Sequence, residues 1–131
     1  MKIEILTLCD AATNNGGKLN ILGSFDHIFG RETPITYPLC ALAIKLRFEK
    51  IEQGSKCLRI SFVNADGKSV IPTLDQTFTV NVPPNESTAS AALVLIIQQI
   101  KLENFGDYSI DLAIDGRLEG SIPLSVRQKS Q

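Results

Sequence analysis

The stretch from Phe105 to Val126, FGDYSIDLAIDGRLEGSIPLSV, constrains the fold more than any other part of the chain. Its apolar residues alternate with polar or small ones, the pattern of a strand with one face in a core and one toward water. The pattern occurs on both sides of Asp115-Gly116, a pair that tolerates positive φ and marks a reversal. The stretch therefore predicts a β-hairpin that turns these side chains inward: Tyr108, Ile110, Leu112, Ile114, Leu118, Ile122, Leu124 and Val126.

The same alternation limits how the two strands of this hairpin pair, because directly opposed residues of an antiparallel pair share a face. A two-residue Asp-Gly loop would oppose Leu112 to Glu119 and place a charge on the buried face. We expect instead a three-residue loop of residues 114–116 with its glycine left-handed, which opposes Leu112 to Leu118. A three-residue loop of residues 115–117 is the alternative.

Further strand patterns fill the rest of the chain. KIEILTLC changes phase near Ile5, which indicates either a bulge or a strand covered on both faces. Asn14-Asn15-Gly16-Gly17 marks a turn, and KLNILGSF then returns as a neighbouring strand. Residues 40–48 carry apolar side chains at every second position, with small and then charged residues between them. This pattern predicts a central strand whose second face is covered over its first half only.

Residues 88–103, TASAALVLIIQQIKLE, could be capped as a helix by Ser87 or Thr88. Many of these residues are β-branched, and apolar residues occur on both faces of the segment. Both features favour a buried strand. We therefore predict one all-β domain over residues 1–131, an antiparallel two-sheet β-sandwich of immunoglobulin or C2 kind with about seven to nine strands. Tyr108, two residues after a glycine, resembles the tyrosine corner of such sandwiches. Residues 127–131 are expected to form a frayed polar tail.

The charge pattern argues against nucleic acid and membranes as partners. The formal net charge is −1 and there is no Lys/Arg cluster, so the electrostatic footprint of such binders is missing. The longest apolar run, residues 89–97, falls far short of the roughly 20 residues that span a bilayer. Glu4 and Asp10 lie where a signal peptide needs its apolar stretch, so we expect a cytoplasmic protein.

Few residues offer catalytic or metal chemistry. Cys9, Cys40 and Cys57 lie in separate strand patterns, which predicts buried, reduced thiols rather than a disulfide frame or a zinc site. His27 is the only histidine, so a nucleophilic cysteine or a serine triad would depend entirely on it. The acidic residues are scattered rather than gathered in adjoining loops, as a calcium site would need. We therefore expect no catalysis, no metal and no cofactor.

Several segments give the chain a resemblance to a known family: LTLCDAA near the start, KLNILGSFDHI from Lys18, KLRFE from Lys45, NADGKSVIP from Asn64, and GDYSIDLAIDG with IPLSV at the end. Over nearly its whole length the chain resembles a bacterial family of small uncharacterised proteins known only as a domain of unknown function. The resemblance implies a compact β-sandwich. It implies no substrate, catalytic residue or named partner.

The longest expected loop, Asp26 to Pro38, is the candidate binding site. Its two prolines limit the entropy lost on ordering, and interfaces favour aromatic and arginine side chains. The candidate contacts are His27, Phe29, Arg31, Glu32 and Tyr37. We predict a non-catalytic interaction or assembly module that binds an unknown protein partner or a second copy of itself.

Two alternatives stay open for this site. A small-ligand or ion-binding sandwich would use the same loop from Asp26 to Pro38. Recognition could instead take place at an exposed strand edge near Val70 to Pro72, where an unpaired strand could accept a strand of the partner.

Overall fold

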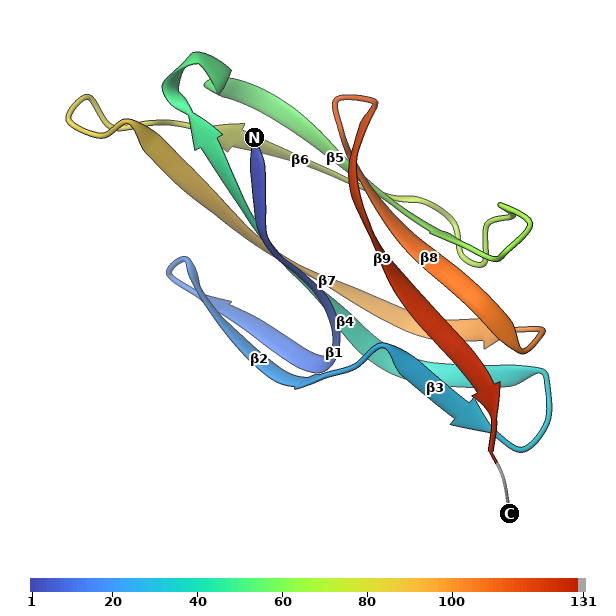
Figure 1. Cartoon of the computed structure of the whole chain (residues 1–131). Coiled ribbons are helices and arrows are strands. Elements are labelled where there is room, and N and C mark those ends of the chain that lie inside the picture. Colours follow the sequence, from blue (N-terminus) through green and yellow to red (C-terminus); the bar gives the residue numbers. More distant parts are fainter. Residues whose placement is uncertain (130–131) are drawn as a thin grey trace.

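The structure is a computed structural model that describes residues 1–129. Among these residues, nine strands form two sheets (Figure 1). The strands are β1 (Lys2–Asn15), β2 (Lys18–Ser24), β3 (His27–Gly30), β4 (Ile35–Glu49), β5 (Gly54–Val63), β6 (Leu74–Val80), β7 (Thr88–Leu102), β8 (Gly106–Ile114) and β9 (Arg117–Gln128), and a short 3-10 turn, η1 (Lys50–Glu52), follows β4. The predicted all-β, two-sheet sandwich is confirmed.

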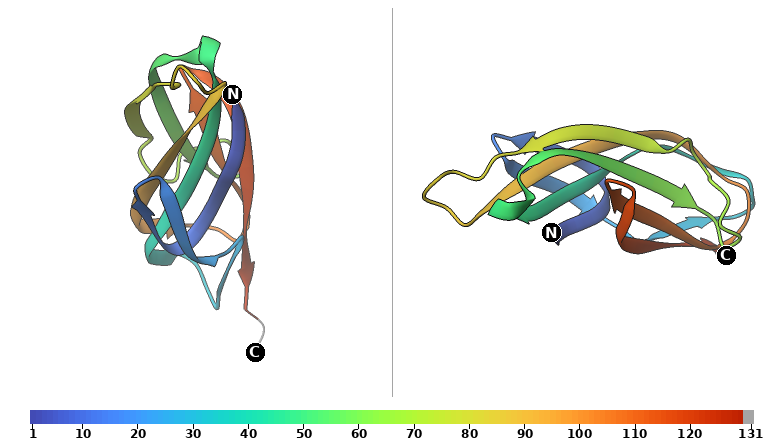
Figure 2. Two further views of the ribbon diagram at one scale, coloured as in Figure 1. Left: turned by 90° about the vertical axis from the view of Figure 1, so that its left-hand side faces the viewer. Right: turned by 90° about the horizontal axis from the view of Figure 1, so that it is seen from above.

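The first sheet has the strand order β2-β1-β4-β7 and the second β3-β9-β8-β5-β6. All neighbouring strands are antiparallel except β3 and β9, which run parallel. The two further views show an elongated sandwich in which β9 runs toward the end of the molecule opposite the N-terminus (Figure 2). β7 has the range predicted for the ambiguous segment, so its reading as a strand is confirmed.

The core lies between the two sheets and follows the period-2 pattern of the sequence. β4 is a central strand, flanked by β1 and β7. Its inward side chains meet those of β5 and β8, and the largest fully buried ones include Leu42, Ile44, Leu46, Phe48, Leu58, Ile60, Phe62, Ile110 and Leu112. Burying one such side chain stabilises the fold by about 1.5–3 kcal/mol. This core forms without a disulfide among the described residues.

The first sheet curls at β1, as the phase change in its sequence indicated. The pairing of β1 with β4 shifts register between Ile3 and Ile5, so the bulge, one of the two alternatives that the sequence left open, is present. Farther along, the β1–β2 hairpin reaches β7, where Asn14 Nδ2 donates a hydrogen bond to the carbonyl oxygen of Ala92 at 3.0 Å. Ala12 and Leu19 of this hairpin pack against the small residues of a second buried cluster, Cys9, Ala41 and Ala43. The hairpin therefore covers Ala41 and Ala43 on the second face of β4, which is the half predicted to be covered in the strand over residues 40–48.

The closing hairpin exists, but its predicted loop is wrong. Ile114 pairs with Arg117 across a two-residue turn of Asp115 and Gly116. Both turn residues have positive φ, 50° and 81°, as a type I′ turn requires. This turn matches the twist of the flanking strands, and it forms although it opposes an arginine to Ile114.

A bulge two residues beyond this turn explains how the hairpin avoids a buried charge. Ala113 pairs with Leu118, whereas Leu112 pairs with Gly120, so Glu119 is the extra residue. The predicted inward position of Leu118 is therefore wrong, and its side chain is 63% exposed. An extra residue flips the strand phase, and apolar side chains then meet: Ile110 with Ile122 and Tyr108 with Leu124.

The hydroxyl group of Tyr108 donates a hydrogen bond to the carbonyl oxygen of Asn104 at 2.7 Å. A tyrosine at the start of a strand that bonds back to backbone a few residues upstream is the arrangement of a tyrosine corner. The bond holds the link between β7 and β8 against the sheet. The resemblance seen in the sequence is therefore confirmed in its geometry.

Two further expectations need correction, one about an exposed strand edge and one about the C-terminal tail. After β5 the chain makes one isolated bridge, between Val63 and Ser69, and Val70 and Ile71 pack against the core. The exposed strand edge expected near Val70 to Pro72 is therefore not there, and β6 forms that edge of the sheet instead. Of the expected tail, residues 127–128 belong to β9, and residues 130–131 lie outside the described residues.

Candidate functional site

The segment from Asp26 to Pro38, predicted to be one long loop, is mostly strand. His27–Gly30 forms β3, which pairs with Ser125 to Gln128 of β9, and β4 begins at Ile35. Residues 31–34 alone connect the two strands. The prediction was wrong because β3 acquires its hydrogen bonds from a strand almost 100 residues away, which no local pattern signals. Pro38 is tolerated in β4 because it lies opposite Gln99 at an unpaired step of the ladder.

The chain crosses between the sheets just before β3. The backbone N–H of Phe25 donates to the carbonyl oxygen of Leu8 in the first sheet at 2.9 Å. One residue later, the carbonyl oxygen of Asp26 accepts a hydrogen bond from the N–H of Ser125 in the second sheet, also at 2.9 Å. Ser24 and Phe25 line two separate hollows, so the two hollows lie on either side of this crossing.

The larger of these hollows has a volume of about 460 Å³ and is named the aromatic recess. Phe29 and His27 lie two residues apart on β3, so their side chains project on the same side. Their rings stack with centroids 5.8 Å apart and planes at 10°. The ring centroids of Phe25 and Tyr37 lie 5.5 Å apart, and the ring planes form an angle of 41°. The recess is lined by Asp10, Gly23, Ser24, Phe25, His27, Ile28, Phe29, Ile35 and Tyr37.

Asp10 supplies a carboxylate to this recess. The hydroxyl group of Tyr37 lies 3.5 Å from Asp10 Oδ1, a long hydrogen bond with the phenol as donor. Partial burial raises the pKa of Tyr37, and the charge of Asp10 raises it further, so the phenol keeps its proton. Within residues 1–129, Asp10 forms no ion pair, as no basic side chain lies within 4 Å of its carboxylate.

His27 is paired with its neighbour in sequence. Its Nδ1 lies 2.6 Å from Oδ1 of Asp26, and both side chains are at least half exposed. This pairing orients the imidazole and directs Nε2 away from Asp26. The hydroxyl group of Ser24 bonds to that of Thr7 and not to His27. Among the described residues there is also no group of three side chains that could hold a metal ion.

The five residues predicted for the site are only partly brought together. His27, Phe29 and Tyr37 line the aromatic recess, whereas Arg31 and Glu32 are exposed in the turn after β3 and line neither hollow. The sequence did not identify two other residues of the recess, Phe25 and Asp10. The strand pattern of residues 18–25 placed Phe25 in phase with its apolar residues. A lone acid within an apolar strand gave no signal of a site, because its partners come from β2, β3 and β4.

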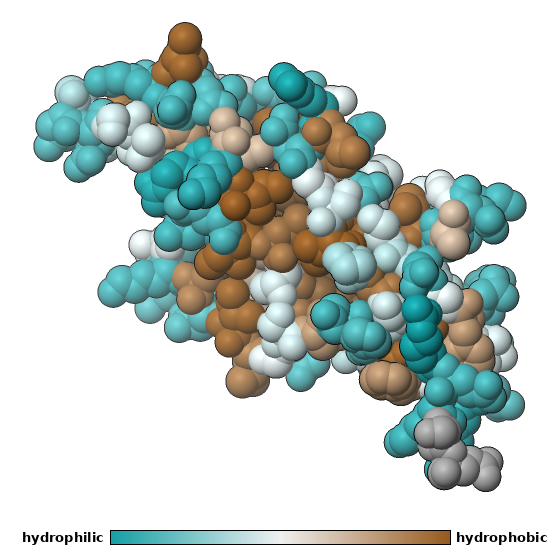
Figure 3. Space-filling view, viewed as in Figure 1, coloured by the Kyte–Doolittle hydropathy of each residue, from teal (hydrophilic) through white to brown (hydrophobic). Residues whose placement is uncertain are grey.

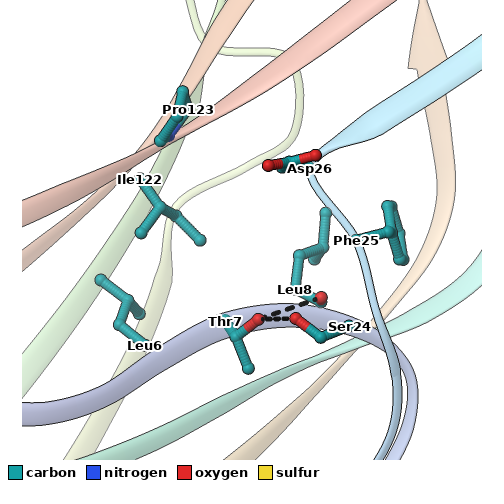
Figure 4. Close-up of a pocket in the computed structure, with 8 residues that line it drawn as sticks. All are labelled: Leu6, Thr7, Leu8, Ser24, Phe25, Asp26, Ile122 and Pro123. Atoms are coloured by element: carbon teal, nitrogen blue, oxygen red, sulfur yellow. Dashed lines mark hydrogen bonds between the residues drawn. The ribbon is translucent and has the colours of Figure 1, made fainter.

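The second hollow, named the edge slot, lies between β1 and β9 and has a volume of about 280 Å³. Apolar side chains gather on the surface between these strands (Figure 3), and in the close-up Leu6 and Ile122 face each other across the slot (Figure 4). In the described structure β2 pairs with β1 only from Cys9 onward, and β3 pairs with β9 only from Ser125 onward. Both strands therefore present unpaired backbone edges to the slot.

The residues that line the edge slot are Leu6, Thr7, Leu8, Ser24, Phe25, Asp26, Ile122 and Pro123. Toward the N-terminus, Ile3 covers Gly120 so closely that a Cβ atom there would lie 2.5 Å from its Cδ1. The slot is therefore bounded by Ile3 at one end and by the chain crossing at the other.

Comparisons with known proteins support the fold and leave the function open. A family model described as "Family of unknown function (DUF6941)" matches residues 4–127. No curated protein matches this sequence. Among the solved structures that resemble it are a β-glucosidase from Listeria innocua in complex with isofagomine, with TM-score 0.51 and 6% identity, and the alkylpurine DNA glycosylase AlkC from Pseudomonas fluorescens bound to DNA containing an abasic site analog, with TM-score 0.49 and 13% identity.

The likeness to the β-glucosidase concerns the fold alone. In each case the match covers 96% of this chain, but only 16% of the β-glucosidase chain and 30% of the glycosylase chain. Within the described residues there is no helix with the length and apolar character needed to cross a membrane.

Proposed function

The chain belongs to this family of unknown function, and from the geometry of its surface we propose that it is a non-catalytic protein-interaction module that binds its partner at the aromatic recess. The observation that carries the proposal is the exposure of aromatic side chains around one hollow. Phe29 is 60% exposed although it is large and apolar. Aromatic residues that are held rigid at a surface are typical centres of binding energy in protein interfaces.

The geometry of the rings supports a preformed binding surface. Phe29 is stacked on His27, and His27 is held by Asp26. Tyr37 is held between Phe25 and Asp10. Side chains that are already ordered lose little entropy when a partner binds. The recess therefore suits recognition of a protein surface or segment.

The surroundings of His27 support a non-catalytic role. A general base must lie within hydrogen-bond reach of the group that it deprotonates. Of the hydroxyl groups that line the recess in the described residues, that of Ser24 is bonded to Thr7 and that of Tyr37 donates toward Asp10. We also place the protein in the cytoplasm, since a reducing compartment suits its three free cysteines.

The proposal is tested with a matched pair of exposed apolar residues, Phe29 in the recess and Leu118 in the closing hairpin, which are 60% and 63% exposed. The partner is identified by cross-linking in native lysate and purified, and its affinity is measured by calorimetry. Phe29→Ala should weaken binding by about tenfold or more, because truncation of a hot spot costs at least 1 to 2 kcal/mol, roughly. Leu118→Ala should bind like the wild type.

Equal affinity of the Phe29→Ala variant and the wild type would overturn the recess as the binding surface. Both variants should keep the melting temperature of the wild type within a few degrees, since both side chains are mostly exposed. A melting-temperature screen against metal ions and metabolites tests the small-ligand alternative, which predicts a rise that Phe29→Ala abolishes.

Self-association at the edge slot is a second candidate, favoured by the two unpaired strand edges there. Such edges can accept a strand from another chain. Sedimentation would then show a mass that rises with concentration. Thr7→Lys, at the slot, should abolish that rise, whereas Thr13→Lys, in the exposed part of β1, should not. A constant monomer mass would contradict this candidate.

A further inference from the structure

We propose that the aromatic recess recognises an arginine side chain of the protein partner. The proposal rests on the function proposed above and names the chemistry of the group that enters the recess. Three features carry it: an unpaired carboxylate, aromatic faces beside it, and a glycine that makes room for both.

The first feature is the charge of the recess. Asp10 is the carboxylate in its lining, and it has no cationic partner within the described residues. The other titratable groups that line the recess are His27, whose Nδ1 is bound to Asp26, and Tyr37, whose hydroxyl group donates toward Asp10. Among residues 1–129, no lysine or arginine lines the recess. The recess is therefore electrically complementary to a cation.

The second feature is the set of aromatic rings beside this carboxylate. A cation gains energy over the face of an aromatic ring, and arginine makes such contacts more often than lysine. The guanidinium group is planar and weakly hydrated, so it can stack on a ring and bind a carboxylate at the same time. Phe25, Phe29 and Tyr37 border the same hollow as Asp10. This combination favours guanidinium over the strongly hydrated ammonium of lysine.

The third feature is Gly23, which fixes where the carboxylate lies. A Cβ atom at this position would lie 2.5 Å from Asp10 Oδ2 and 2.9 Å from its Cγ. Gly23 also has a φ of 68°, which other residues rarely adopt. The side chain of Asp10 therefore lies directly over Gly23, at the edge of the recess, with Oδ2 beside Gly23 and Oδ1 toward the hydroxyl group of Tyr37.

The openness of the recess, and not its volume, suits a side chain rather than a whole metabolite. Ligand sites for drug-sized molecules are enclosed and have volumes of about 300–1,000 Å³. The recess has about 460 Å³ but is open to solvent. An arginine that projects from a partner can enter it while the rest of the partner contacts the exposed face of Phe29.

The test uses the whole protein, labelled with ¹⁵N, and three blocked tripeptides: acetyl-Gly-Arg-Gly-amide, its citrulline counterpart and its lysine counterpart. Citrulline has the shape of arginine without the charge. The arginine peptide should give saturable shifts of the amide resonances of Asp10, Phe25, Phe29 and Tyr37. The citrulline peptide should bind about tenfold more weakly, because it loses both the cation–π contact and the charge-assisted hydrogen bond. The lysine peptide should lie between them.

A pair of variants connects this preference to the carboxylate. Asp10→Asn should reduce the affinity for the arginine peptide by about tenfold and bring it to that of the citrulline peptide. Asp66→Asn, in an exposed turn away from the recess, should change nothing. Both variants should fold like the wild type, since neither carboxylate forms an ion pair in the described structure.

Equal binding of the arginine and citrulline peptides, or undiminished arginine binding by Asp10→Asn, would overturn the assignment of arginine. That outcome is distinct from failure of the proposed function. The module would stand if Phe29→Ala still lost its partner, and it would fall if Phe29→Ala kept the partner.

Discussion

Cys57 differs from the other two cysteines in its surroundings, and the prediction that all three are buried was wrong for this residue. Cys9 and Cys40 are buried, whereas Cys57 is exposed. Leu58 faces the core from β5, so the side chain before it must face away. The alternation itself contained this result, because a strand that turns Leu58 inward turns Cys57 outward.

We predict one fast-reacting thiol per folded chain. Cys57 should react with a thiol reagent within minutes, whereas Cys9 and Cys40 should react only after the protein unfolds. Burial, with a smaller contribution from the neighbouring Cys9, raises the pKa of Cys40 to about 11, so little thiolate is present near neutral pH. Thiol titration with and without denaturant measures this. Cys57→Ser should remove the fast phase, and a fast phase that persists in this variant would contradict the assignment.

The face assignment of β8 gives a second prediction at single residues. Ile110 is fully buried, whereas Asp111 lies on the opposite face and accepts hydrogen bonds from Ser109 and Ser121. Ile110→Asp should cost more than about 4 kcal/mol, because it places an unpaired charge in the core. Asp111→Asn should cost about 0.5–1 kcal/mol, since an amide oxygen still accepts both bonds. Chemical denaturation of the two variants measures this difference, and similar midpoints would refute the face assignment of β8.

At the scale of elements, the link from β2 to β3 organises the candidate site. β2 ends beside β1, and three residues later β3 lies beside β9 in the other sheet. This crossing carries Phe25, and β3 carries His27 and Phe29 to the same side. A segment that changes sheets cannot be paired by its own local sequence, so its position depends on both β1 and β9.

We predict that Gly23→Ala and Gly16→Ala differ in binding more than in stability. Both glycines have positive φ, 68° and 60°, so each alanine should cost about 1–2 kcal/mol in backbone strain. A Cβ atom at Gly16 meets nothing within 4 Å, whereas one at Gly23 displaces the carboxylate of Asp10. Gly23→Ala should therefore also lose arginine binding. Unfolding curves measure the effect on stability, and the peptide titration measures the effect on binding. Unchanged arginine binding by Gly23→Ala would contradict a role of Asp10 in the recess.

At the scale of the whole molecule, a network of charges joins strands that are distant in sequence. Glu4 of β1 binds Arg47 of β4 through two hydrogen bonds of 2.8 and 3.2 Å, and Arg47 also donates to Thr88 of β7 at 3.0 Å. The N-terminal amino group pairs with Glu52 at 2.8 Å. The Arg47 hydrogen bond holds the pKa of Glu4 below its ordinary value of 4.5, and a hydrogen bond from the backbone N–H of Glu49 does the same for Glu52.

This network predicts a loss of stability in acid. A carboxyl group whose pKa is lower in the folded than in the unfolded chain stabilises the fold above the unfolded pKa. That contribution is lost as pH falls below about 4.5 and through the lower folded value. Melting temperatures at pH 7 and pH 3 should therefore differ less for Glu4→Gln than for the wild type. Glu86→Gln, at an acid that forms no ion pair in the described residues, is the control, and an equal pH effect in both variants would contradict the role of Glu4.

The sequence by itself determined which segments are strands and, for most of them, which side chains face the core. It predicted the two-sheet fold, the central strand over residues 40–48 and the covering of half of its second face, and it indicated the bulge near Ile5 as one of two alternatives. These features follow from local geometry, because side chains alternate along a strand whatever strand lies next to it. The hydrophobic effect then selects the apolar face for burial.

Only the tertiary structure decided the pairings between distant segments. The parallel pairing of β3 with β9 turned an expected loop into a strand, and the bulge at Glu119 reversed the expected exposure of Leu118. The same holds for the candidate site, where Asp10 joins Phe29 only because β1 and β3 meet at the crossing of the chain. A strand pattern records the direction of each side chain but not the identity of the neighbouring strand, and hydrogen bonding between distant backbones supplies that choice.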